Sequence, residues 1–111
     1  MRNMIFVNEI WKDAQNVARI MSVEDDDTKL RLDILVVFAG DSNLLLAYLV
    51  KEESPYELKW YNIIEVRNEE DSRLTAFVDD IRKVLKLYID EDSVRKIAYM
   101  IQNSIYNFLK R

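Results

Sequence analysis

The sequence contains no cysteine and no histidine in its 111 residues. Without these residues the chain cannot form a disulfide framework, a Ser-His-Asp or Cys-His catalytic centre, or nearly any zinc or haem site. The absence of cysteine also agrees with a cytoplasmic location. Much of known enzyme chemistry is excluded on these grounds.

Glycine and proline occur once each, as Gly40 and Pro55. A single glycine cannot build a glycine-rich phosphate-binding loop. The hydrophobic fraction of 50% and the charged fraction of 32% exclude disordered and collagen-like chains. We therefore predict one folded domain over residues 1–111.

Long apolar runs and excess positive charge are also missing. The run Ile34–Ala39 is six residues long, whereas about 18 are needed to span a bilayer. No signal peptide is predicted in Met1–Ile10. The net charge of −4 is opposite to that of a typical nucleic-acid-binding domain. We expect a cytoplasmic chain without membrane or nucleic-acid partners.

The first part of the chain has apolar residues at steps of mostly three and four between Ile5 and Met21. This spacing predicts an amphipathic helix. The acidic segment Glu24–Thr28 predicts a solvated loop after it.

The apolar period then changes to two in three segments, Leu30–Phe38, Leu44–Lys51 and Tyr56–Val66. Alternation of this kind predicts strands, and the turn residues around Gly40 and Pro55 separate them. The three segments predict an antiparallel meander. Trp60 is expected in the core because it shares a face with apolar neighbours.

Two helices are predicted after the meander, one following Asp71 or Ser72 and one beginning within residues 90–93. For residues 84–89, a short strand is the alternative prediction to a helix. We expect Phe77 on the first of these helices to pack against the first strand. The result is an α+β fold of order α-β-β-β-α-α.

This order resembles that of the small acidic secretion-chaperone folds. The resemblance implies a dimer that binds partner polypeptides. The absence of cysteine and histidine also favours a binding function over catalysis. We therefore predict a non-catalytic protein-binding module or regulator, with no cofactor.

The predicted binding residues are Tyr99, Met100 and Tyr106 on the last helix and Tyr61 on the third strand. Tyrosine and methionine are enriched at interfaces because they bury a large area and tolerate water nearby. The strands also carry apolar residues on both faces. We therefore predict a homodimer with a further protein partner of unknown identity.

An alternative interpretation is enzymatic. Glu57 and Lys59 share one face of the third strand, where a carboxylate could hold Mg²⁺ and an ammonium could stabilise phosphorane charge. With Asp41 this grouping resembles the PD-(D/E)xK nuclease superfamily. The resemblance implies Asp41 and Glu57 as metal ligands, Lys59 as the catalytic lysine, and Glu9 as the acid of the first helix.

A second alternative is a binder of single-stranded nucleic acid, because aromatic and basic residues are interleaved on adjacent strands. The acidic runs 25–27 and 90–92 lack the spacing of an EF-hand loop, and we predict no metal site there. The residues of the nucleic-acid alternative are Tyr56, Trp60, Tyr61, Lys51, Lys59 and Arg67.

Overall fold

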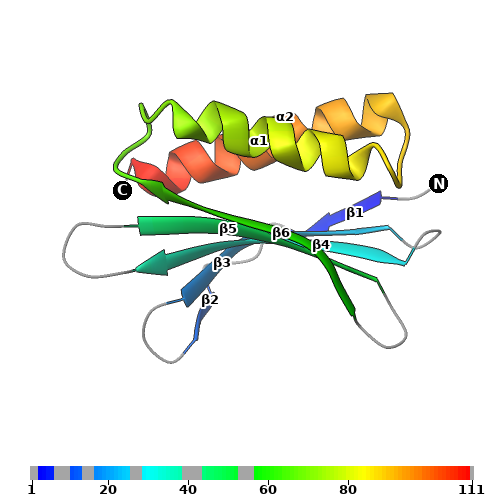
Figure 1. Cartoon of the computed structure of the whole chain (residues 1–111), viewed down its shortest axis with the longest axis horizontal. Helices are drawn as coiled ribbons and strands as arrows, with labels where there is room; N and C mark the ends of the chain where they lie inside the picture. Colours follow the sequence, from blue (N-terminus) through cyan, green and yellow to red (C-terminus); the bar gives the residue numbers. More distant parts are fainter. Residues whose placement is uncertain are drawn as a thin grey trace.

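The computed structural model describes residues 3–6, 11–13, 17–25, 29–38, 44–52 and 57–110. They form an α+β structure in which two helices cover one face of an antiparallel sheet (Figure 1). The strands are β1 (Asn3–Phe6), β2 (Trp11–Asp13), β3 (Val17–Asp25), β4 (Leu30–Phe38), β5 (Leu44–Glu52) and β6 (Glu57–Val66). The helices are α1 (Arg73–Leu85) and α2 (Glu91–Leu109).

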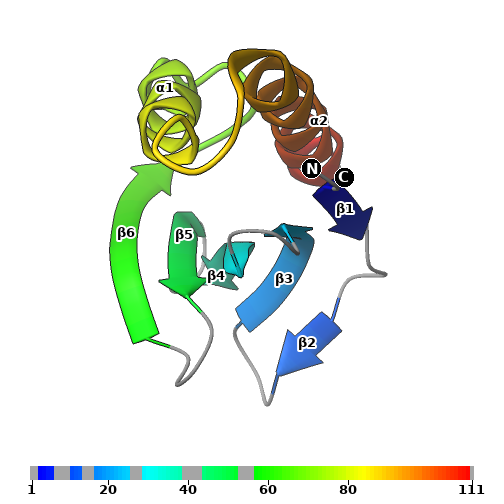
Figure 2. The same cartoon turned by 90° about the vertical axis from the view of Figure 1, so that its right-hand side faces the viewer.

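The four long strands β3, β4, β5 and β6 are neighbours in sequence order, and each pairs antiparallel with the next. The short strands β1 and β2 both pair with β3 on its other side. The sheet curves, and β6 forms one of its edges (Figure 2). Among the described residues, no strand pairs with the outer side of β6.

The predicted N-terminal helix over Ile5–Met21 is wrong, because the described parts of this segment lie in β1, β2 and β3. The order α-β-β-β-α-α is therefore replaced by four long strands followed by two helices, and the likeness to secretion-chaperone folds loses its basis. A register shift between Arg19 and Met21 explains part of the error. It leaves the consecutive residues Ile20 and Met21 both buried, and such spacing imitates a helix.

The acidic loop predicted over Glu24–Thr28 is also shorter than expected. Glu24 and Asp25 belong to β3, where Asp25 is only 2% exposed. Asp26–Thr28 lie outside the described residues. The three predicted strands, by contrast, are present as β4, β5 and β6, with bounds within one residue of those expected.

The core lies between the helices and the sheet. Phe77, Ile81 and Leu85 of α1 are fully buried in one cluster with the β4 side chains Leu32, Ile34 and Val36, as predicted. The ring of Phe77 meets that of Tyr48 edge-on at 5.7 Å between centroids. Trp60 is not part of this core, because it is 44% exposed at the rim of the edge strand.

Residues 84–89 finish α1 and then form a hydrogen-bonded turn, so the strand alternative is wrong. The amide of Leu87 donates to the carbonyl of Val84 at 3.0 Å. The second helix begins as predicted, because the Asp90 carboxylate accepts hydrogen bonds from the Ser93 amide (3.1 Å) and hydroxyl (2.7 Å). Neither helix is long and apolar enough over its described residues to cross a lipid bilayer.

Candidate functional site

The predicted binding residues of α2 do not all lie on one exposed surface. Tyr99 and Met100 are 59% and 39% exposed. Tyr106 is partly buried against the core, and its hydroxyl accepts a hydrogen bond from Gln102 Nε2 at 3.4 Å. Tyr99 and Met100 are therefore accessible to a partner, whereas Tyr106 helps to hold α2 on the molecule.

A groove runs between α1 and α2 beside Tyr99, with a volume of about 330 Å³. Its floor contains Val78 and Ala98, which are only 6% and 4% exposed. A shallower depression of about 460 Å³ adjoins it, formed with Lys96 and Met100. We call the first of these the helix groove; its lining residues are Val78, Arg82, Arg95, Ala98, Tyr99, Gln102 and Asn103.

The charged side chains that line the helix groove are both arginines, although the whole chain carries a net charge of −4. Arg82 lies 3.7 Å from Asp79, and Arg95 lies 3.3 Å from Asp92, each one turn away on its own helix. All four side chains are at least 45% exposed. Exposed pairs of this kind contribute little to stability, so both guanidinium groups are available to an external carboxylate.

A polar cluster under α1 fixes one wall of the groove. The Tyr48 hydroxyl and the Asn62 amide both donate to Asp80 Oδ2, the latter at 3.4 Å. Burial, together with the hydrogen bond to Asp80, raises the pKa of Tyr48 above its ordinary value. The cluster ties α1 to β5 and β6. The sequence analysis did not predict this cluster. The only indication of it was the Tyr48 hydroxyl within the apolar sequence of β5.

A second cluster holds the turn that follows α1. Trp60 Nε1 donates to the Tyr88 hydroxyl at 3.1 Å, and that hydroxyl donates to Glu52 Oε1 at 3.1 Å. Burial raises the pKa of Tyr88, and its hydrogen bond to Glu52 acts in the same direction. Trp60 therefore keeps a polar partner at the rim of the sheet, which explains why it lies outside the core.

The described structure does not test the grouping of the nuclease interpretation, because most of its residues cannot be placed. Asp41 and Glu9 lie outside the described residues, as does the side chain of Glu57, while Lys59 is exposed on β6. No three acidic side chains in the described parts of the chain gather to hold a metal ion. The helix and strand order on which the resemblance depended is also different.

The described residues of the nucleic-acid alternative do not all share one face of the sheet. Trp60 and Tyr61 are consecutive in β6 and so face opposite sides of the sheet. Lys51 Nζ lies 3.8 Å from the buried carboxylate of Asp33, which also accepts from the Ser22 hydroxyl at 2.7 Å. Tyr56 lies outside the described residues. No continuous stacking surface is formed by the members that the structure describes.

Comparison with protein-family models, curated proteins and solved structures gave no significant match for this chain. The functional argument therefore depends on the chain's own surfaces. Two of them expose large apolar side chains: α2 at Tyr99 and Met100, and β6 together with the turn after α1. The second set comprises Leu58, Trp60, Tyr61, Ile63 and Leu87.

Proposed function

We propose that the chain is a non-catalytic, cytoplasmic protein-binding module, which works as a homodimer and holds a partner polypeptide in the helix groove. The observation that carries this proposal is the exposure of Tyr99 and Met100 beside a groove with an apolar floor. Exposed apolar patches on folded chains commonly mark interaction surfaces. Tyrosine and methionine suit such a surface because both bury a large area.

The partner we expect is a polypeptide segment with an apolar side chain next to carboxylates. The apolar side chain would cover Val78 and Ala98 on the groove floor. The carboxylates would pair with Arg82 and Arg95, whose planar guanidinium groups bind carboxylates with two parallel hydrogen bonds. Basic segments are disfavoured by the same two arginines.

Capture from a lysate of the native host tests this proposal when wild type is compared with groove variants. We expect at least one polypeptide that wild type retains and that both Tyr99→Ser and Arg95→Glu lose. Leu87→Ser is the matched control, because Leu87 is 66% exposed but lies away from the groove. Circular dichroism of each variant verifies that its fold is intact.

The proposal fails if every captured polypeptide binds equally to wild type and to both groove variants. It also fails if the Leu87→Ser control loses the same polypeptides, since the groove would then have no special role.

A further inference from the structure

We propose that the helix groove receives an amphipathic helix of the partner polypeptide, with acidic residues on both sides of its apolar stripe at one end. The assignment rests on the proposed function and adds to it the conformation of the bound segment and the place of its charges. The bound helix would lie on α1 and α2 as a third helix packed against them.

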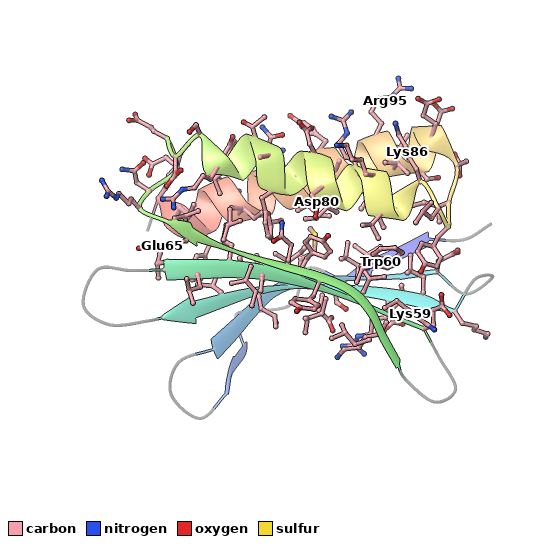
Figure 3. All side chains as sticks on the ribbon, in the orientation of Figure 1. Lys59, Trp60, Glu65, Asp80, Lys86 and Arg95 are labelled. Carbon is pink, nitrogen blue, oxygen red and sulfur yellow. The ribbon has the colours of Figure 1, made fainter. Side chains whose placement is uncertain are left out.

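The groove is open to a partner from the outer side of the helices. Figure 3 shows Arg95 pointing away from the sheet, whereas Asp80 points toward it. Arg95 lines the groove, and its side chain is 67% exposed. A partner can therefore reach the groove without displacing either helix from the sheet.

Both walls of the groove are helices, and this restricts what can lie against them. Val78 and Arg82 come from α1, and the remaining lining residues come from α2. Within a helix the backbone amides and carbonyls bond to each other, so these walls present side chains only. An extended segment would turn backbone groups toward walls without backbone partners, and burying such groups unpaired is costly. A helix satisfies its own backbone and avoids this cost.

The floor of the groove suits close contact with another helix. Val78 and Ala98 are small and almost fully buried, so a partner helix can come near the contact between α1 and α2. On α2 the lining residues run from Arg95 to Asn103. At a rise of about 1.5 Å per residue, this part of α2 spans about 12 Å, which corresponds to about two turns of a bound helix.

The cations of the groove gather at one end. Arg82 is three residues before the end of α1, and Arg95 is four residues after the start of α2, so both lie close to the turn that joins the helices. They line the groove from opposite helices. Gln102 and Asn103 are uncharged and line the groove about two turns farther along α2. Carboxylates are therefore favoured on both sides of a bound helix at the end beside the turn.

The depression that adjoins the groove has the same sign of charge. It is formed by Arg95, Lys96, Tyr99 and Met100. The lining residues that the structure describes for the two depressions include three cations and no carboxylate. A basic helix would meet only like charges here, so the groove distinguishes partners by charge as well as by shape.

Three synthetic peptides, each about 18 residues long, test the assignment. The first is a helix-forming peptide with leucine at i, i+3, i+4 and i+7 and with glutamate on both sides of this stripe at one end. The second has proline at two central positions, which prevents a continuous helix, and the third has lysine in place of every glutamate. Fluorescence anisotropy measures the dissociation constant of each peptide, and amide shifts in NMR spectra of the chain locate the site.

The glutamate helix should bind at least about tenfold more tightly than the other two peptides and should shift amides along the groove. Arg82→Glu and Arg95→Glu should each weaken its binding about tenfold, and the double variant should prefer the lysine peptide. Lys83→Glu is the matched control, because Lys83 also lies in the last turn of α1 but does not line the groove. It should bind the glutamate helix as wild type does.

The outcomes separate the conformation and charge of the bound segment from the proposed function. Equal binding of the glutamate helix and its proline variant would overturn the helical conformation and leave the proposed function standing. Equal binding of the glutamate and lysine peptides would overturn the assignment of charge. If no peptide binds but a polypeptide from the lysate is captured through the groove, the groove takes another kind of segment. Capture that does not depend on the groove would overturn both proposals.

Discussion

Asp80 shows how a single side chain can join the two layers of the molecule. Its carboxylate accepts from Tyr48 on β5 and from Asn62 on β6, while its own backbone belongs to α1. Tyr48 is 2% exposed, so its hydroxyl has no access to solvent as an alternative partner. A buried hydroxyl without a partner is costly, and Asp80 therefore restricts where α1 can lie on the sheet.

Tyr48→Phe should lower the free energy of unfolding by about 1.5–3 kcal/mol, the usual range for a hydrogen bond to a charged group. It should also change the pH dependence. The pKa of Tyr48 is raised in the folded chain, so below the ordinary value of 10.0 its stabilisation is fully present. As pH rises above that value, the unfolded chain ionises first and stability is lost.

Urea denaturation between neutral and alkaline pH measures this effect. The wild-type free energy of unfolding should fall more steeply above about pH 10 than that of Tyr48→Phe. Tyr99→Phe is the matched control because Tyr99 is exposed on α2. Identical alkaline slopes for wild type and Tyr48→Phe would show that this hydroxyl does not couple to folding.

Individual residues also explain how far the candidate site could be predicted. Tyr99 and Met100 were found from helical periodicity alone, because both lie off the apolar stripe of α2 and stay exposed. Tyr106 stays a predicted binding residue, but it lies near enough to the buried side to pack partly against the core. The helix groove could not be predicted, because it depends on which face of α1 lies beside α2.

At the scale of elements, the two helices and the last three strands follow from local pattern, whereas the N-terminal strands do not. In β4, every second residue from Leu30 to Val36 is apolar and at most 2% exposed, and the sequence shows this apolar period of two. In β3, the bulge breaks the alternation at Ile20. Bulges depend on the partner strand, so the sequence of one segment does not reveal them.

The start of α2 provides a test at this scale. Asp90 accepts hydrogen bonds from Ser93, which lower the pKa of Asp90 below its ordinary value. The stabilisation is therefore present above the ordinary value of 3.8 and is lost as pH falls through the lowered pKa. Asp90→Ala should reduce stability at neutral pH and have a smaller effect in acid.

Thermal unfolding followed by circular dichroism at neutral pH and at about pH 2 checks this expectation. Asp90→Asn is the matched variant, because an amide oxygen can still accept the Ser93 bonds without titrating. It should retain most of the neutral-pH stability that Asp90→Ala loses. Equal melting temperatures for wild type and Asp90→Ala at neutral pH would contradict the role of this cap.

At the scale of the whole molecule, protection of backbone amides should follow the strand order. The central strands β4 and β5 are bonded on both sides, so their amides should exchange most slowly with solvent. Amides of the edge strand β6 should exchange faster, because among the described strands β6 is bonded on one side only.

Hydrogen exchange measured by NMR tests this order. Amides of β4 and β5 that exchange as fast as those of β6 would contradict it.

The order of elements along the chain has a consequence for biosynthesis. All of the described strands precede α1 and α2, so a ribosome delivers these strands before the residues that cover their apolar face. Forty-three residues separate Val66 from Leu109, which corresponds to about 2–9 s of translation. During that interval the side chains of Leu32, Ile34 and Leu46 have no helix over them. Substitutions that delay the docking of α1 therefore increase losses to aggregation during synthesis, even where the finished protein is as stable as wild type.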